Sequence, residues 1–198
     1  MSVEIPGLPP LHWTGEQGRA TFDGETLELV ASTGSDLIND ATGGPAQQGA
    51  TALVFDAPDH FSLAARVAVV PPRTTFDAGA LVLWADLDHW AKLCFEFSPQ
   101  GRAMVVSVVT NGYSDDVNST LVLGEALSLR IASVGPAWVF HSSADGEQWD
   151  FVRLFRLQTE LPIQAGFLAQ APLGDRCDAR FDRIALSADV PLDLRDGS

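Results

Sequence analysis

The chain has 198 residues, of which 46% are hydrophobic and 19% are charged, and its formal net charge is −14 at pH 7. This hydrophobic content can bury a sizeable core and excludes a globally disordered chain. The acidic surplus disfavours nucleic acids and anionic membranes as partners, because both would be repelled. We expect one domain over residues 1–198, with its core at about 10–187, a short N-terminal arm and a C-terminal tail.

The first residues, MSVEIPGLPPLHW, lack the basic and apolar regions of a signal peptide, and no apolar run is long enough to span a membrane. The two cysteines, Cys94 and Cys177, are expected to be free thiols in a cytoplasmic protein. The four histidines are scattered, and neither a CxxC nor an HExxH motif is present. We therefore expect no metal and no cofactor.

After a proline-containing arm at 1–10, short apolar or alternating runs follow one another, and nearly every break between them carries Gly, Pro, Asp or Asn. No run shows a sustained 3.6-residue apolar period, and a long loop is expected at 34–49. The pattern predicts an all-β fold, an antiparallel β-sandwich of the jelly-roll type. The expected strands are 11–13, 19–22, 26–31, 51–55, 61–70, 79–85, 89–97, 102–111, 120–123, 128–133, 137–143, 149–155, 161–169 and 178–186.

The most informative stretch is 76–97, FDAGALVLWADLDHWAKLCFEF, which predicts two strands joined by a tight polar turn. Its first strand is nearly all apolar, as in a strand covered on both faces. Successive side chains of the second strand alternate between two faces, with Lys92 and Glu96 about 13 Å apart on the same face. The core face is predicted to carry Ala91, Leu93, Phe95 and Phe97, and the opposite face Trp90, Lys92, Cys94 and Glu96.

Extending the alternation to other strands predicts a polar set on the concave face of one sheet. Such charges are costly in a half-buried face unless they are paired, so they indicate either a ligand site or an internal ion-pair network. A ligand site of this kind suits hydroxyls or carboxylates, and an aromatic ring would support a sugar. The predicted binding residues are Lys92, Glu96, Ser107, Asn111, Arg130 and His141, with Trp84 and Trp90 as stacking platforms and Asp77, Asp115 and Asp116 at the rim.

The segment 110–116, TNGYSDD, is rich in small polar residues and is predicted to be a loop at the rim of this pocket. Asp115, Asp116 and Asn118 also offer the hard oxygen ligands that calcium prefers, although their spacing is not that of an EF-hand. A turn held by its own Asn and Ser side chains is the simpler alternative.

Seven short patterns in order carry a family resemblance: FDAGALVLW, DHWAKLCFE, VVTNGYSDD, LRI, SSADGEQW, GFLAQAP and FDRI. Together they resemble the uncharacterised domain family that includes the yeast regulation-of-enolase protein, over about residues 10–187. The resemblance implies a concanavalin A-like lectin/glucanase fold, similar also to the accessory β-sandwich domains of some xylosidases. It implies a site on the concave face of the larger sheet, but little about activity, because function belongs to the site rather than to the fold.

The glucanases of this superfold carry an E-x-D-x-E arrangement on one strand, whereas here the similar strand offers only Glu96. A glycosidase needs two carboxyls about 5 to 9.5 Å apart, so the second would have to be Asp77, Asp115 or Asp116. We therefore predict a non-catalytic module that binds a saccharide or another polyhydroxylated small ligand. A protein-interaction or regulatory domain acting on a metabolic enzyme, through the acidic surface and the loop at 34–49, is the alternative, and a glycoside hydrolase is the third.

Overall fold

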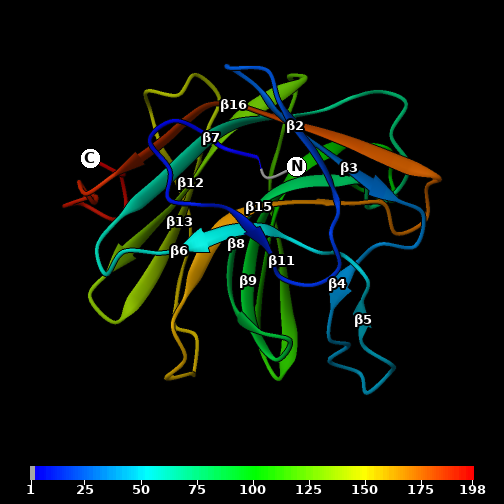
Figure 1. The fold of residues 1–198 in the computed structure, drawn as a ribbon, viewed down its shortest axis with the longest axis horizontal. Helices are drawn as coiled ribbons and strands as arrows, with labels where there is room; N and C mark the ends of the chain where they lie inside the picture. The colour runs from blue at the N-terminus through cyan, green and yellow to red at the C-terminus, as the bar shows by residue number, and fades with distance from the viewer. Residues whose placement is uncertain (1–2) are drawn as a thin grey trace.

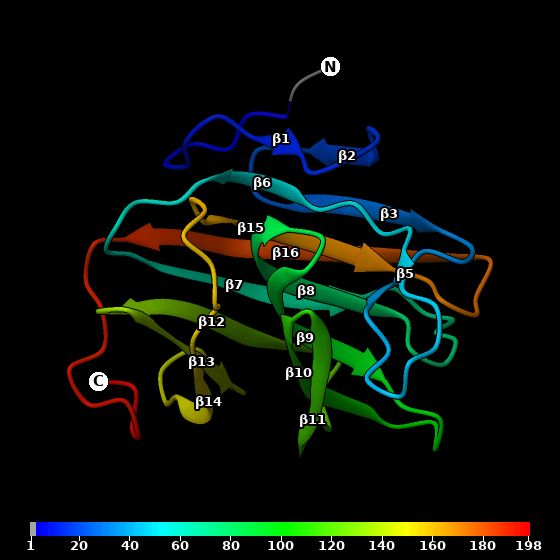
Figure 2. The same cartoon turned by 90° about the horizontal axis from the view of Figure 1, so that it is seen from below.

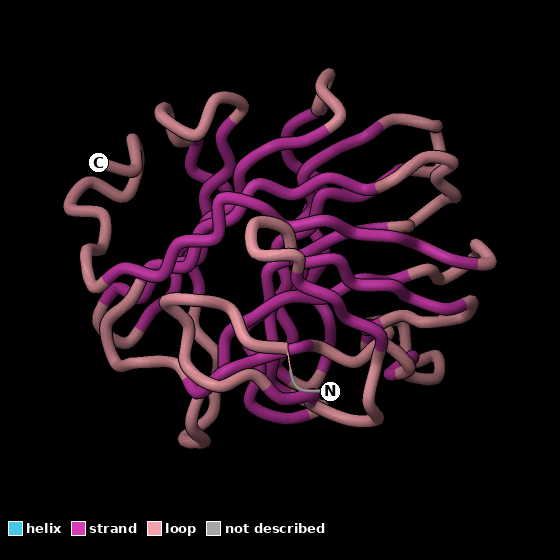
Figure 3. Tube along the Cα trace, turned by 45° about the horizontal axis from the view of Figure 1, so that its top comes forward, coloured by secondary structure: helices cyan, strands magenta, loops and turns pink. Residues whose placement is uncertain are grey.

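The computed structural model describes residues 3–198, and within that range the chain forms strands and loops without a helix (Figure 3). Two large antiparallel sheets make a sandwich, which confirms the predicted fold class (Figure 1). The strands are β1 His12–Trp13, β2 Arg19–Phe22, β3 Leu27–Ser32, β4 Leu37–Ile38, β5 Gln47–Gln48, β6 Leu53–Asp56, β7 Ser62–Val69, β8 Ala78–Asp86, β9 His89–Phe97, β10 Ala103–Asn111, β11 Tyr113–Leu121, β12 Ala126–Val134, β13 Ala137–Ser143, β14 Asp150–Phe155, β15 Gln164–Gln170 and β16 Arg176–Ser187.

Sheet A has the strand order β1-β6-β15-β8-β9-β10-β11, and sheet B has the order β14-β13-β12-β7-β16-β3-β2. The remaining pair, β4 and β5, forms a small hairpin beside sheet A. This hairpin belongs to the segment 35–50, most of which falls in the long loop predicted at 34–49, where a brief bridge or turn is expected only at 35–39. No helix of residues 3–198 is long and apolar enough to cross a membrane.

The main core lies between the two sheets. Leu93 and Phe95 of β9 point into it, as the alternation predicts, and Phe167 of sheet A meets Phe181 of sheet B edge to face at 5.1 Å between ring centroids. Burying each such side chain contributes about 1.5–3 kcal/mol to the free energy of folding, so this layer makes the main hydrophobic contribution to stability.

A second apolar cluster lies on the outer face of sheet A, under the segment 35–50. Leu37 of this segment packs with Trp84, Trp90 and Leu168 of the sheet, and all four are buried. Sheet A is thus covered on both faces here. Because both faces are covered, the sequence of β8 is a nearly continuous apolar run. This confirms the prediction that the strand is covered on both faces.

The predicted loop at 110–116 is wrong, because β11 begins at Tyr113 and only a tight turn around Gly112, with φ of 79°, separates it from β10. The predicted strand at 120–123 is likewise only the end of β11. The strand lies at the edge of sheet A, and most of its residues are exposed on both faces. Because β11 buries no apolar face, its sequence shows no apolar alternation and resembles that of a polar loop.

The two cysteines are free, as predicted, and both are buried. Cys94 belongs to the outer cluster of sheet A and Cys177 to the core between the sheets. Burial raises the pKa of the Cys94 thiol well above its usual range and that of Cys177 to about 12. Neither thiol is therefore a nucleophile at neutral pH, because the reactive form is the thiolate.

Candidate functional site

A cleft of about 300 Å³ opens on the outer face of sheet A, beside the segment 35–50. Strands β9, β10 and β11 contribute one part of its lining, and the rest comes from β4 with Asp36 before it, Gln47 of β5, the end of β15 with the loop that follows it, and Phe76. Its polar lining residues are Asp36, Gln47, Lys92, Glu96, Asp116, Asn118 and Gln170, and its apolar ones are Ile38, Phe76, Val106, Val108, Pro172 and Leu173.

Glu96 is the most unusual group in the cleft. It is only 9% exposed, and within residues 3–198 its carboxyl makes neither a hydrogen bond nor an ion pair. Burial raises its pKa to about 7, Lys92 opposes this rise, and the nearby carboxylates of Asp36 and Asp116 add to it. A buried carboxyl without a partner is costly, so a group that the protein does not supply would complete the site.

Lys92, the only lysine in the sequence, is buried on the same face but is fully engaged. Its Nζ donates hydrogen bonds of 2.7 Å to the Leu37 carbonyl and 2.7 Å to Gln170 Oε1, and lies 3.5 Å from Asp36 Oδ1. Gln170 in turn donates to the Phe76 carbonyl at 3.0 Å. Lys92 therefore ties both walls of the cleft to the sheet, because two of its three N–H donors are in hydrogen bonds and its charge is paired with Asp36.

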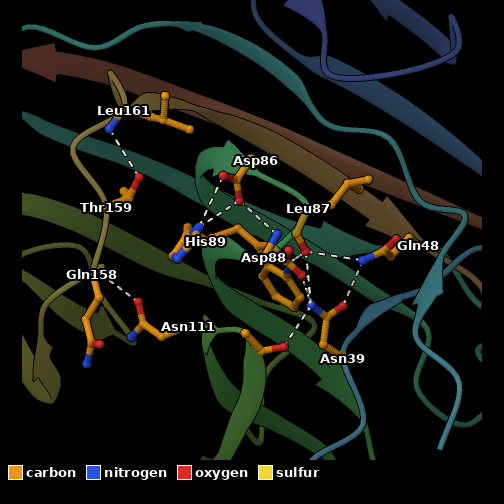
Figure 4. A network of polar contacts seen from close by, with 12 residues as sticks. Asn39, Gln48, Asp86, Leu87, Asp88, His89, Asn111, Gln158, Thr159 and Leu161 are labelled. Carbon is orange, nitrogen blue, oxygen red and sulfur yellow. Dashed lines mark hydrogen bonds and ion pairs between the residues drawn. The ribbon is translucent and has the colours of Figure 1, made fainter.

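A second network secures the segment 35–50 beyond the cleft (Figure 4). The buried side chain of Asn39 donates to the carbonyl of Leu87 at 3.0 Å and that of Gly112 at 3.2 Å, and its Oδ1 accepts from Gln48 at 3.0 Å. Trp90 Nε1 also donates to the Leu87 carbonyl, at 3.2 Å. These bonds join the segment to two turns of sheet A, so the segment forms a fixed wall of the cleft.

Phe76 stands at the rim of the cleft in a left-handed backbone conformation, with φ of 69°, and is 37% exposed. Its backbone is held on both sides, because its N–H donates to the Phe97 carbonyl at 2.7 Å and its carbonyl accepts from Gln170. A large residue in this region is rare and costs about 1 kcal/mol or more. Sequence reasoning missed Phe76, because no glycine marks the positive φ.

Of the residues predicted to bind ligand or form the rim, Lys92, Glu96 and Asp116 line one cleft. Trp84 and Trp90 share the predicted face with Lys92 and Glu96, but they are buried in the outer cluster. Their role as stacking platforms is therefore wrong, because the segment 35–50 covers their rings.

Ser107 and Asn111 do not face the cleft. Val106 and Val108 do, so Ser107 on the opposite face lies buried between the sheets, where its hydroxyl has no described partner. Asn111 accepts from the Gln158 N–H at 2.6 Å and so holds the loop that follows β14.

Asp77 and Asp115 have local structural partners. Asp77 is buried and accepts from the Thr74 N–H at 2.7 Å, which closes the turn before β8. Asp115 pairs with Arg153 at 2.9 Å. Asp115 therefore points away from the cleft that its neighbour Asp116 lines, and the two cannot share a calcium ion as adjacent ligands.

Arg130 and His141 are paired on neighbouring strands of sheet B, not sheet A, so the prediction that they share a face with Lys92 and Glu96 is wrong. The C-terminal segment, which runs past one end of β12 in Figure 2, accepts a hydrogen bond from each of them. Arg130 Nη2 donates to the Gly197 carbonyl at 2.7 Å and stacks over Trp149 at 4.3 Å, and His141 Nε2 donates to the Leu194 carbonyl at 2.9 Å. Burial lowers the pKa of His141, which favours the neutral ring.

Replacing Gly197 with valine should release the segment 192–198 while the sandwich stays folded. A Cβ at Gly197 would lie 2.5 Å from Arg130 Nη2 and 2.6 Å from Trp149 Cβ, and its φ of +73° disfavours any β-branched residue. Hydrogen exchange of the amides in this segment should rise by at least about tenfold in Gly197→Val, which means that docking loses about 1.4 kcal/mol or more. Unchanged protection would contradict the role assigned to this glycine.

A different cavity, of about 340 Å³, lies beside β2 and β3 and is lined by Trp13, Glu16 and Arg19 among others. Its charged groups are exposed to solvent rather than buried, and it contains no counterpart of Glu96. Within residues 3–198 the cleft on sheet A is therefore the stronger candidate of the two, because a buried, unpaired carboxyl faces its open space.

The sequence profile of a family described as "Protein of unknown function (DUF1349)" matches residues 13–189. The chain belongs to the DUF1349 family. No protein with a curated description matches the sequence of this family member.

Solved structures are similar to this DUF1349 chain in fold. A functionally unknown protein from Saccharomyces cerevisiae is 22% identical, with a TM-score of 0.81 over 91% of this chain and 97% of the yeast chain. The GH43 protein BlXynB from Bacillus licheniformis is 14% identical, with a TM-score of 0.67 over 83% of this chain but only 33% of its own. The exoplasmic/lumenal domain of VIP36, in a Ca²⁺/Man3GlcNAc-bound form, is 10% identical, with a TM-score of 0.55 over 97% of this chain and 90% of its own. These likenesses establish a lectin-like β-sandwich fold.

Proposed function

We propose that the cleft on sheet A binds a saccharide or another polyhydroxylated small ligand without transforming it. The observation that carries this proposal is Glu96, a buried carboxyl that faces the cleft and has no partner in the protein. Asp116, Asn118 and Glu96 supply hydrogen-bonding groups for hydroxyls, and the exposed ring of Phe76 supplies an apolar surface for a sugar face. The bound form of VIP36 gives a precedent for a saccharide on this kind of fold, at the level of fold alone.

Binding is favoured over hydrolysis by the electrostatics of the two free carboxyls. A glycosidase separates the pKa values of its pair, one raised to keep an acid and the other low to keep a base or nucleophile. Here loss of water raises the pKa of both Glu96 and Asp116, and Lys92 opposes the rise in both cases. The pKa values of the two carboxyls are thus shifted in the same direction, so the pair lacks the division of roles that hydrolysis requires.

A screen of neutral mono- and oligosaccharides by thermal shift tests the proposal, with Phe76→Gly as the diagnostic variant. Glycine relieves the left-handed strain, so the melting temperature should stay the same or rise by about 2–4 °C, the equivalent of about 1 kcal/mol. Affinity for the saccharide found should fall by roughly tenfold, because about 1.4 kcal/mol of apolar contact is lost.

The matched control is Tyr113→Ala, which removes a more exposed aromatic ring at the start of β11, outside the lining of the cleft. It should leave the affinity unchanged. If Phe76→Gly binds as tightly as the wild type, the cleft is not the saccharide site. Release of reducing sugar during the screen would contradict the non-catalytic part of the proposal.

A regulatory role on a metabolic enzyme, and a cytoplasmic location, stay predictions of the sequence alone. The segment 35–50, which that alternative uses as a contact, is largely committed to closing the cleft through Leu37 and Asn39. Its exposed tip, 41–47, is what a protein partner would meet.

A further inference from the structure

Resting on the proposed function, we infer that the ligand of the cleft carries a positive charge: an amino sugar, or another polyol bearing an ammonium group, whose nitrogen binds at Glu96. The inference concerns which hydroxylated ligand the site prefers. It rests on the negative charge of those lining carboxyls that no hydrogen bond or ion pair within the protein offsets.

The charged residues that line the cleft are Asp36, Glu96, Asp116 and Lys92. Lys92 and Asp36 lie 3.5 Å apart and offset each other. Lys92 also donates two hydrogen bonds to the walls, so its charge and most of its donors are already bound within the protein. Glu96 and Asp116 remain, without a hydrogen bond or an ion pair from residues 3–198.

The neighbouring Arg73 lowers the pKa of Glu96 less than Lys92 does, and it makes no ion pair with that carboxyl. Its guanidinium lies over the rings of Phe95 and Phe97, at 4.4 and 5.2 Å from their centroids, and donates to the backbone carbonyls of Asp77 and Phe95. It is therefore engaged behind the rim. The cleft presents two uncompensated carboxyls to a ligand and no free cation.

An ammonium group matches this need better than either a neutral hydroxyl or a metal ion. Its three N–H donors can bond Glu96 and still reach a second acceptor, and a charge-assisted bond is about twice as strong as a neutral one. A ligand carboxylate would be repelled. Within residues 3–198 no three His, Cys, Asp or Glu side chains gather closely enough to hold a metal ion, so a chelated cation is disfavoured.

The test uses three sugars, glucose, galactose and mannose, each paired with its 2-amino-2-deoxy and its N-acetylated form, plus glucuronate. Dissociation constants are measured by calorimetry at pH 7, with the wild type, Glu96→Gln and Asp115→Asn. Asp115→Asn is the matched control, because it removes one negative charge from the residue next to Asp116, on the side of β11 that faces away from the cleft.

We expect at least one amino sugar to bind about tenfold more tightly than both its parent sugar and its N-acetylated form, and glucuronate to bind more weakly than glucose. Glu96→Gln should reduce the ratio of amino-sugar to parent affinity to about one, whereas Asp115→Asn should keep it. A preference that survives in Glu96→Gln, or that is lost in Asp115→Asn, would show attraction by the acidic surface as a whole and would overturn the inference.

The remaining outcomes separate the two proposals. Equal binding of amino and parent sugars would overturn the positive-charge inference and leave the saccharide site standing. Tighter binding of glucuronate would do the same. Absence of binding by every sugar in the set would overturn both.

Discussion

Replacing Glu96 with glutamine is expected to stabilise the protein at pH 8 by up to about 3 kcal/mol and to change its stability little at pH 4. The pKa of Glu96 is about 7 in the folded protein, against 4.5 for the free side chain. Between these values the folded state keeps a proton that the unfolded chain has released, so stability falls as the pH rises from about 4.5 to 7. Each pKa unit corresponds to about 1.36 kcal/mol, and glutamine removes the titration while keeping the shape of the side chain.

Urea unfolding of the wild type and of Glu96→Gln at pH 4, 6 and 8 measures this difference. For a domain of this size, 3 kcal/mol at pH 8 corresponds to roughly 6–12 °C in melting temperature. The control is Glu147→Gln in an exposed turn, which should change stability by less than about 0.5 kcal/mol at each pH. Equal stability of Glu96→Gln and the wild type at pH 8 would mean that Glu96 has a partner or water that lowers its pKa.

The second large effect is expected from Lys92→Met, which should destabilise the protein by roughly 3–5 kcal/mol. Methionine fills much of the volume but leaves Asp36 without its cation and removes the donor from Leu37 and Gln170. The sequence alone favours Lys92 as a ligand-binding group. Its contacts make it a structural tie between sheet A and the walls of the cleft, so its loss would impair binding mainly by loosening the site.

Two readouts separate these roles. Urea unfolding gives the loss of stability, and hydrogen exchange shows whether the amides of 35–50 lose protection before the rest of the fold. The control is Arg66→Met, which breaks a partly exposed ion pair with Asp182 of 2.9 Å and should cost no more than about 1 kcal/mol. If Lys92→Met is as stable as the wild type but fails to bind the saccharide, Lys92 is a ligand group and the structural role is wrong.

Because Lys92 is the only lysine, it is also a probe of the cleft. Its amine is buried in the folded protein and becomes reachable when the segment 35–50 lifts from the sheet.

Much of the fold follows from the sequence because period-two alternation is strong wherever a strand buries at least one face. In β9 the alternation assigns Leu93 and Phe95 to the main core and Lys92 and Glu96 to the opposite face, and the structure agrees. The limits of β13 are also those predicted, 137–143. These strands pair along their length with neighbours on both sides, so sequence pattern and burial coincide.

The residues of the site could be predicted only in part. Alternation shows which face of its strand a side chain occupies, but it does not show which of the two sheets the strand joins. The residues around Arg130 and His141 do not indicate that their strands belong to sheet B, because membership of a sheet depends on pairing with strands that are distant in the sequence. Trp90 lies on the predicted face with Lys92 and Glu96, but whether its ring is covered depends on where the segment 35–50 packs on sheet A. Phe76 joins the site through a backbone conformation that its own sequence does not favour.

Titration of an isotope-labelled sample with the tightest saccharide of the panel, followed through backbone amide chemical shifts, tests the central claim most directly. Saturable shifts are expected to concentrate around the cleft, at Phe76, Glu96, Asp116 and Gln170. Shifts that concentrate instead on the outer face of sheet B around His141, or none at all at saturating ligand, would contradict the assignment of the cleft as the binding site.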